Sequence, residues 1–435
     1  MNPFLRLFGI TCVFFLALIA WMTLGGITTA RNDEQGGMLS TRVQDLYGSA
    51  MTQQAPAVTL VWPVLRNHHE EITDAQGRVT MTNRPVWETA TSVLVPKQTR
   101  IAANLSLDER RKGLMWFPLY KVGFQGAWQI PIETTVPENA HVEITFVYPD
   151  ASTHYDDFTF VIDGQDVART LVNTPGLVTA SILGPIVPGQ VISLAIGYRS
   201  QGMTEWRYQP TREVGQVEDF QLAMTTDFAA IDFPAMTMSP TLKTRADAGW
   251  KLDWNFARLV TGQAIGMTMP THIQPGELAS MLSFSAPIPL GLYFVWIYVL
   301  GLLRKYEIHP INYLLLAASF FAFNLLFAYT ADHLEVEYAF ALASAVSVLL
   351  TVSYLRLVVG ARFAFVEAGL AQLLYQVGFG VAHFFDGFTG LTITVLGILT
   401  LFALMQLTGR IKWSEVFGSE PEPPKARGPA LTPGV

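Results

Sequence analysis

The sequence of 435 residues is poor in charge and almost devoid of cysteine. Charged residues make up 14% of the chain, against about 25% in an average soluble protein, whereas hydrophobic residues make up 50%. The net charge is −7. This value gives no reason to expect nucleic acid as a partner, because nucleic-acid-binding proteins present a basic face. The single cysteine, Cys12, excludes a disulfide within the chain, so any large domain must be stabilised by burial of apolar surface.

The common catalytic signatures are also missing. The sequence contains no His-Glu-x-x-His, no Gly-x-Ser-x-Gly and no P-loop. Gly378-Phe379-Gly380 lies within an apolar segment and does not follow a strand, so it is not a dinucleotide-binding fingerprint. We therefore predict no cofactor and no metal site, and we expect that the protein is not an enzyme.

Long apolar segments are what the chain has in abundance. A run of about 20 apolar residues matches the hydrocarbon thickness of a bilayer. Consecutive runs of this kind, joined by very short polar loops, cannot form the core of a soluble domain, so we predict an integral membrane protein. Six transmembrane helices are expected, from the runs 5–27, 290–303, 311–329, 338–359, 363–385 and 391–407. The first run is longer than the core of a signal peptide, which is about 7–15 residues, and we expect it to remain as an uncleaved helix.

The basic residues predict the orientation of these helices. Arg304 and Lys305 follow the second predicted helix, Arg356 and Arg362 flank the loop between the fourth and fifth, and Arg410 and Lys412 follow the sixth. The loops 331–337 and 386–390 contain no Lys or Arg. Because positive residues mark the cytoplasmic side, we expect a multi-pass membrane protein with both termini in the cytoplasm and residues 31–282 outside, in a periplasm-like space. A model with five or seven helices breaks this pattern.

The long segment between the first two predicted helices changes from helical to β character. Residues 37–54 show helical spacing, whereas 141–148 and 250–256 alternate between apolar and polar residues. Many short alternating runs indicate an antiparallel, sandwich-like β domain in the periplasm. We predict a transmembrane helix at 1–30, a helical stalk at 31–55, the β-rich domain at 56–282, a five-helix transmembrane bundle at 283–413 and a disordered cytoplasmic tail at 414–435.

Few polar residues are candidates for a functional site within the membrane region. Glu367 lies about one turn into the fifth predicted helix. We expect a structural role, in which it snorkels to the cytoplasmic surface or pairs with Arg362; the alternative is a proton or ion relay. Asn324, Gln372 and Gln376 are expected to bridge helices by hydrogen bonds. Four further candidates lie at the predicted outer ends of helices, where water and headgroups can solvate them: Asp332, His333, His383 and Asp386.

Two polar clusters stand out in the β-rich segment. Residues 68–71 read His-His-Glu-Glu, but neighbouring strand residues point to opposite faces, so a solvated hairpin is favoured over a metal site. His154, Asp156 and Asp157 resemble an acid–base group, yet they lie in a polar turn and are expected to be solvated.

Several motifs resemble the CreD family of bacterial inner-membrane proteins. Residues 308–315, Ile-His-Pro-Ile-Asn-Tyr-Leu-Leu, are similar to the family's His-Pro-x-x-Tyr-Leu-Leu helix entry, in which His309 would cap the helix that Pro310 begins. Residues 407–413 resemble the closing Thr-Arg-x-Ile-x-Trp segment, although Gly409 replaces its first basic residue, and residues 108–114 resemble a strand entry of the family. Asp332-His333 matches an acidic-His pair.

The resemblance implies a role in cell-envelope integrity, with links to colicin tolerance and the β-lactam response, and it supplies no catalytic residues. The expected partners are membrane lipid and a periplasmic protein or envelope glycan. Two alternatives stay open. A cavity lined by Glu367, Gln376 and Asn324 would favour a transporter or lipid-handling protein. A concave patch that joins His154, Asp156 or Asp157 with other carboxylates would favour an enzyme in the β-rich domain.

Overall fold

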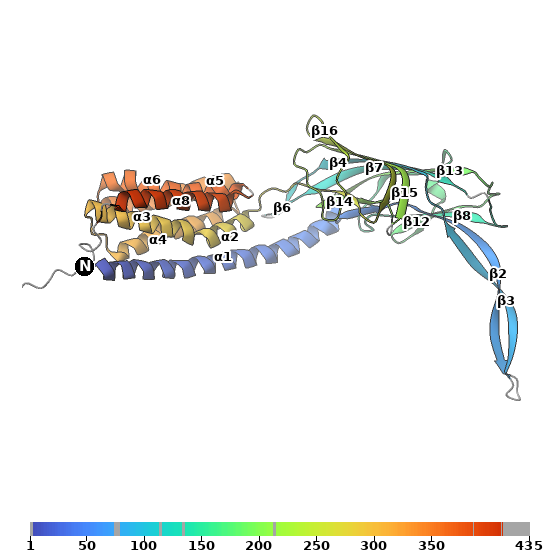
Figure 1. Cartoon of the computed structure of the whole chain (residues 1–435), viewed down its shortest axis with the longest axis horizontal. Helices are drawn as coiled ribbons and strands as arrows, with labels where there is room; N and C mark the ends of the chain where they lie inside the picture. Colours follow the sequence, from blue (N-terminus) through green and yellow to red (C-terminus); the bar gives the residue numbers. More distant parts are fainter. Residues whose placement is uncertain are drawn as a thin grey trace, which may run out of the picture. The chain divides into compact units, whose positions relative to one another are not determined.

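The structure, a computed structural model, describes residues 3–73, 79–112, 115–132, 135–211, 215–385, 387–409 and 411. The chain divides into two compact units (Figure 1). We call Met1–Gln35 together with Ile273–Val435 the helical unit, and Gly36–His272 the sheet-rich unit.

The helical unit contains the long apolar runs. Its helices are α1 (Pro3–Tyr47, of which residues 3–35 belong to this unit), α2 (Pro275–Ser285), α3 (Pro287–Arg304), α4 (Pro310–Thr330), α5 (Val336–Val358), η2 (Phe363–Ala368), α6 (Gly369–Gln372), η3 (Leu373–Gly378), α7 (Phe379–Val381), η4 (Ala382–Phe384) and α8 (Phe388–Thr408). Among the described residues, six helices are long and apolar enough to cross a membrane, with Phe363–Phe384 counted as one. The prediction of six membrane helices is confirmed at this level of length and composition.

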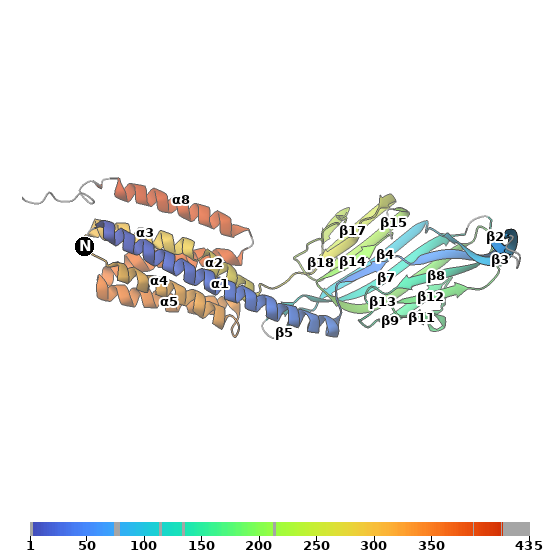
Figure 2. The same cartoon turned by 90° about the horizontal axis from the view of Figure 1, so that it is seen from below.

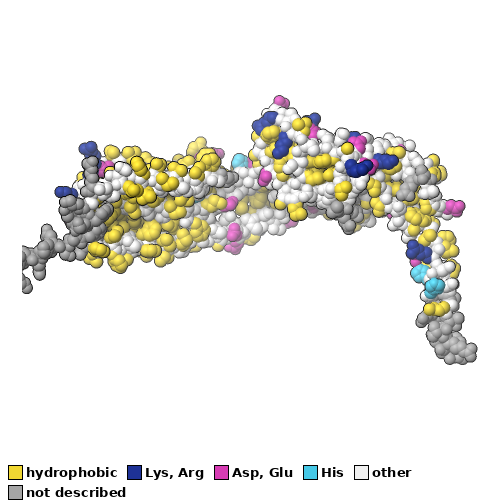
Figure 3. All heavy atoms as spheres, viewed as in Figure 1, with side chains coloured by type: hydrophobic (Ala, Val, Ile, Leu, Met, Phe, Trp, Pro, Cys, Tyr) yellow, Lys and Arg dark blue, Asp and Glu magenta, His cyan; other side chains and the backbone are white. Residues whose placement is uncertain are grey.

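Hydrophobic side chains cover the sides of the helical unit, and its Lys and Arg side chains gather toward one end in this view (Figure 3). Inside the unit, α1 packs against α4, because Trp21 is fully buried and its ring lies 5.7 Å from that of Phe321. Pro287 and Pro310 occupy first positions of α3 and α4, where a missing N–H costs nothing.

The fifth apolar run is not a regular α-helix. It contains two π-helical segments, η2 and η3, separated by the short α6. Such wide turns are rare and occur often at functional sites. Glu367 lies in η2, Gln376 lies in η3, and Gln372 lies in α6 between the two.

Apart from residues 36–47 of α1, the sheet-rich unit is built mainly from strands. They are β1 (Met51–Gln54), β2 (Ala57–Thr73), β3 (Val79–Val93), β4 (Gln98–Leu107), β5 (Arg110–Lys112), β6 (Met115–Phe117), β7 (Leu119–Pro131), β8 (His141–Val147), β9 (Asp156–Ile162), β10 (Gln165–Asp166), β11 (Val172–Thr174), β12 (Leu177–Ile182), β13 (Val191–Met203), β14 (Glu205–Gln209), β15 (Gly215–Thr226), β16 (Leu242–Arg245), β17 (Trp250–Thr261) and β18 (Ile265–Thr268), with one short helix η1 (Ala168–Thr170). The predicted β-rich region is confirmed.

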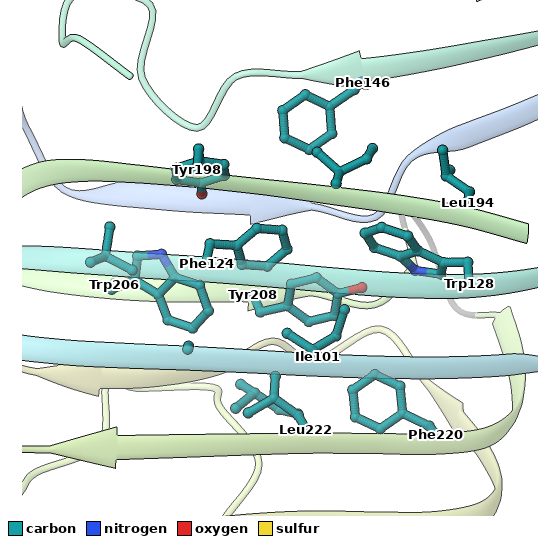
Figure 4. Packing of buried hydrophobic residues seen from close by; sticks show 14 of the residues in the cluster. Ile101, Phe124, Trp128, Phe146, Leu194, Tyr198, Trp206, Tyr208, Phe220 and Leu222 are labelled. Carbon is teal, nitrogen blue, oxygen red and sulfur yellow. The ribbon is translucent and has the colours of Figure 1, made fainter. Parts of the chain in front are cut away.

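Two large sheets share the main core with the three-stranded sheet β1-β14-β18. The larger has the order β10-β9-β13-β7-β4-β15-β17-β16 and the smaller the order β11-β12-β8-β2-β3. One hydrophobic cluster contains residues of both. Figure 4 shows Phe146 of β8 near Tyr198 of β13, and their ring centroids are 6.3 Å apart. Phe124 of β7 stacks on the same tyrosine at 5.1 Å.

The sheets are not purely antiparallel, which corrects the expectation from the alternating pattern. β4 pairs with β15 in parallel, and β1 pairs with β14 in parallel. Parallel neighbours need a long crossover connection. Here residues 108–214 connect β4 to β15, and residues 55–204 connect β1 to β14. Alternation along one strand reports which face is buried but not the direction of its neighbour.

The helix expected over 37–54 ends at Tyr47, and Met51–Gln54 form strand β1. Gly48 follows the helix with a φ of 89°, a left-handed conformation that ends helices and favours glycine. The helical spacing of Leu39, Val43 and Tyr47 correctly indicated a packed face of the helix, because these side chains form a hydrophobic cluster with Phe117 of β6. The end of the sheet-rich unit also differs from the end of the predicted 56–282 domain, because α2 belongs to the helical unit.

Candidate functional site

Glu367, the sequence's principal membrane candidate, forms an ion pair within the helical unit. Its Oε1 accepts from Nη2 of Arg304 at 2.5 Å. The Glu367 side chain is 17% exposed and that of Arg304 is 51% exposed. Pairing with Arg362 was one of the two structural roles expected for Glu367, and the structure shows Arg304 as its partner instead. Tertiary packing brings the end of α3 to η2, and nothing in the local sequence signals that approach.

A lateral groove of about 570 Å³ lies beside this ion pair. Apart from Arg304 and Glu367, its walls are almost entirely apolar and come from α3, η2, α6, η3 and α8. The lining residues are Trp296, Leu300, Arg304, Val366, Glu367, Leu370, Ala371, Leu374, Tyr375, Leu396, Leu399, Thr400, Ala403 and Leu407. Tyr375 and Thr400 share a hydrogen bond of 2.8 Å between their hydroxyl groups, which links η3 to α8.

Asp332 also forms an ion pair. Its Oδ2 lies 3.0 Å from Nη2 of Arg31 on α1. The same Arg31 nitrogen donates to the carbonyl of Ala328 at 3.2 Å, and the guanidinium lies over the ring of Tyr329. The backbone N–H of His333 donates to the carbonyl of Thr330 in the turn after α4. Asp332 therefore links α1 to the turn after α4, whereas His333 takes part in that turn through its backbone.

His383 is held by hydrogen bonds on both ring nitrogens. Nε2 lies 3.0 Å from Oγ of Ser285, and Nδ1 lies 3.2 Å from the carbonyl of Phe379. These contacts fix the ring between α2 and the end of the fifth apolar run. Asp386, its expected neighbour at the helix end, lies outside the described residues.

His309 caps α4, as the sequence predicted. Its Nδ1 accepts from the backbone N–H of Ile311 at 3.3 Å. This bond satisfies one of the unpaired donors at the helix start. The geometry accounts for His309 without any ligand.

The predicted glutamine bridges form a buried polar network. Nε2 of Gln372 donates to Oγ of Ser347 on α5 at 2.9 Å, and Nε2 of Gln376 donates to the carbonyl of Phe320 on α4 at 3.2 Å. Both predictions are confirmed. Asn324 differs, because its Nδ2 donates to the carbonyl of Phe320 in its own helix.

The polar clusters of the sheet-rich unit lie on exposed strands. Nε2 of His68 is 2.5 Å from Glu88 across the β2–β3 hairpin, and the side chains of Glu70 and Glu71 lie outside the described part. His154 and Asp156 are exposed and 3.7 Å apart, whereas Asp157 pairs with Arg199. Among the described residues, no group of three or more His, Cys, Asp or Glu side chains could hold a metal ion.

A depression of about 490 Å³ on the face of the eight-stranded sheet was not signalled by the sequence. Two adjoining rows of paired residues run across its strands. One contains Thr159, Gly197, Gln125, Ala102, Ala223 and Asp253; the other contains Ala195, Ala127, Arg100, Gln221 and Asn255. Small residues thus form the floor, and amide or hydroxyl side chains surround it. Small residues on a strand give no pattern that distinguishes a binding surface from ordinary sheet, which is why the depression went unpredicted.

Charge in the depression is mostly neutralised. Nη2 of Arg100 donates to Oδ2 of Asp219 at 2.7 Å. Hydrogen bonds from Arg100 and Gln98 lower the pKa of the Asp219 carboxyl, so the guanidinium keeps a charged partner. Asp253 contributes the remaining carboxylate. The arrangement is suited to hydrogen bonding with a polar, largely uncharged molecule.

Comparison with known families bears on the helical unit. Residues 286–414 match the family model described as inner membrane protein CreD. This segment belongs to the CreD family. The match includes Glu367 and its partner Arg304, the whole lateral groove, His309, Asp332, His333 and His383. None of the curated proteins matches the chain.

The CreD match supports the expected inner-membrane character, and it begins after the last residue of the sheet-rich unit. The depression therefore has no counterpart supplied by the match and is judged on its own geometry. Of the motifs quoted above, 308–315 and 407–413 lie within the matched segment, whereas 108–114 lies outside it.

Proposed function

We propose that this CreD-family chain supports cell-envelope integrity from the inner membrane by binding an envelope glycan on its sheet-rich unit. In this proposal both termini are cytoplasmic and the sheet-rich unit is periplasmic. The observation that carries the proposal is the amide-lined depression on the eight-stranded sheet. The protein would act by binding rather than by catalysis.

The chemistry of the depression suits a sugar chain. Gln125, Gln221 and Asn255 offer side-chain amides, each of which both donates and accepts hydrogen bonds. Sugar hydroxyl groups have the same double capacity. The floor of Ala and Gly residues lets a ligand approach the sheet closely, and the paired Arg100 adds no strong preference for an anion.

The two alternatives receive less support from the geometry. The groove beside Glu367 is lined by neither Gln376 nor Asn324, which belong to the hydrogen-bonded core. The depression is lined by none of His154, Asp156 and Asp157. Of the three residues expected to line a transporter cavity, only Glu367 lines the groove, and none of the three residues expected in an enzyme site lines the depression.

A periplasmic protein is a second candidate partner, favoured by the β2–β3 hairpin, which extends from the rest of its sheet (Figure 1). Leu65 and Trp87 face each other across its strands, and they are 52% and 68% exposed. Exposed apolar residues grouped on one surface are typical of protein interaction sites. Replacement of Trp87 by Ala would weaken this interaction and leave glycan binding unchanged.

Substitutions in the depression test the glycan proposal. Ala127 and Ala195 are paired, exposed residues of its floor, so Ala127→Trp and Ala195→Trp fill the depression without disturbing the core. Ala257→Trp is the matched control, at an exposed position of β17 two residues beyond Asn255. Solubilised full-length protein is sedimented with purified cell-wall glycan, and the variants are expressed in cells that lack the gene.

We expect the two floor variants to lose most of the cosedimentation and to leave cells sensitive to detergent, at membrane levels equal to those of the unaltered protein. The control should behave like the unaltered protein. The glycan proposal is wrong if the unaltered protein does not cosediment, or if both floor variants bind and protect normally.

A further inference from the structure

The groove beside Glu367 combines apolar walls with one charged end. It lies among helices of membrane-spanning length, and α8, which forms one wall, buries only Leu396 and Thr400 against the rest of the unit. Figure 2 shows α8 along one side of the helical unit. The lining residues of α8 extend from Leu396 to Leu407, a length of about 17 Å at 1.5 Å per residue. The groove is thus long, apolar and on the side of the helical unit.

Its charged end has unused hydrogen-bonding capacity. Oε1 of Glu367 is paired with Arg304, but Oε2 is buried and has no hydrogen-bond partner among the described residues. A buried carboxylate oxygen without a donor is unfavourable. Arg304 is half exposed and donates to Glu367 through Nη2, which leaves other N–H groups of the guanidinium available.

We propose that this groove binds a phospholipid whose headgroup carries both a phosphate and a primary ammonium. The acyl chain lies along the apolar wall of α8. The phosphate accepts hydrogen bonds from Arg304, and the ammonium donates to Oε2 of Glu367. A headgroup with both charges provides a partner for Arg304 and for Glu367, whereas a phosphate alone or an ammonium alone provides a partner for only one of them.

Other headgroups fit less well. An anionic headgroup without an ammonium would place a second negative charge beside Glu367 and leave Oε2 without a donor. A quaternary ammonium has no N–H, so it cannot donate to that oxygen. The proposal is independent of glycan binding, because the depression lies in the other unit.

Lipid binding to the full-length protein in detergent tests the proposal. Native mass spectrometry would compare phosphatidylethanolamine, phosphatidylcholine and phosphatidylglycerol with the same acyl chains. We expect phosphatidylethanolamine to bind about tenfold more tightly than the other two, the scale of one charge-assisted hydrogen bond. Equal binding of the three lipids would show ordinary lipid association and overturn the proposal.

Substitutions in the groove and at Glu367 test the contributions of the acyl chain and of the headgroup separately. Ala403→Trp fills the groove from α8 and should abolish the preference, whereas Leu401→Trp, at a position 59% exposed and outside the groove, should retain it. Glu367→Gln should bring phosphatidylethanolamine down to the level of phosphatidylcholine, since the ammonium loses its charged acceptor. A preference that survives in Ala403→Trp or in Glu367→Gln contradicts the assignment to this site.

Discussion

Arg31 and Asp332 form an ion pair at 3.0 Å that ties the N-terminal helix to the turn after α4. Their side chains are 31% and 13% exposed, so the pair is better shielded from water than a surface ion pair. Arg31 also donates to the carbonyl of Ala328. The contact joins the beginning of the chain to the segment that matches the CreD family model.

The first prediction concerns this pair. Asp332→Asn should destabilise the protein in detergent by about 1 kcal/mol, because it leaves a partly buried guanidinium without its carboxylate. Glu335→Gln, at an exposed position nearby, is the control and should change stability by less than about 0.5 kcal/mol. Thermal unfolding of the purified variants measures both. Equal melting temperatures for the two variants would mean that the pair contributes nothing.

The sequence was informative where the signal is local. Apolar runs predicted the membrane helices, and the His309-Pro310 pair predicted a capped helix start. It could not predict that Arg31 meets Asp332, because the two are far apart in the chain and each looks like an ordinary charge at a helix end. The same limit explains why Arg304 rather than Arg362 pairs with Glu367.

Strand order was also beyond the sequence. The side chains of β4 and β15 alternate as in any strand with one buried face, yet the two strands are parallel neighbours. The depression depends on this pairing, because it brings Ala102 beside Ala223. A surface assembled from several strands becomes visible only when their register is known.

The second prediction is that the sheet-rich unit folds by itself. Residues 36–272 form their own core and contain no cysteine, so folding should need neither metal nor disulfide. Circular dichroism of the excised segment should show a β spectrum that chelator and reductant leave unchanged. A mainly helical spectrum, or unfolding on chelation, would contradict this prediction.

The third prediction concerns Asp150, which accepts hydrogen bonds from the backbone N–H groups and hydroxyls of Ser49 and Ser152 at 2.6–2.8 Å. Burial alone would raise the pKa of this carboxyl, but the hydrogen bonds outweigh it and lower the pKa below 3.8. A lowered pKa in the folded state stabilises the fold above pH 3.8, and this contribution is lost as the pH falls through the folded-state pKa.

Asp150→Asn should therefore reduce the free energy of unfolding of the sheet-rich unit by about 1–2 kcal/mol at pH 7. The difference from the unaltered unit should narrow in acid. Urea unfolding from pH 7 to pH 3 measures it, with Asp166→Asn as an exposed carboxylate control. A difference that stays constant with pH would show that the charge of Asp150 has no part in it.

The last prediction concerns orientation in the membrane. Arg304 and Lys305 end α3, Arg356 lies in the last turn of α5, and Arg362 precedes η2. Successive membrane helices alternate in direction, so the end of α3, the end of α5 and the start of the next span fall on one side. Positive residues favour the cytoplasmic side, so we expect the sheet-rich unit to lie outside the cytoplasm. A reporter enzyme that is active only outside the cytoplasm should be active when fused after Ser200 and silent when fused after residue 418.

Activity of the reporter at residue 418 would contradict a cytoplasmic C-terminus. Silence of the reporter at Ser200, with the fusion present at normal level, would place the glycan-binding depression in the wrong compartment for its proposed partner.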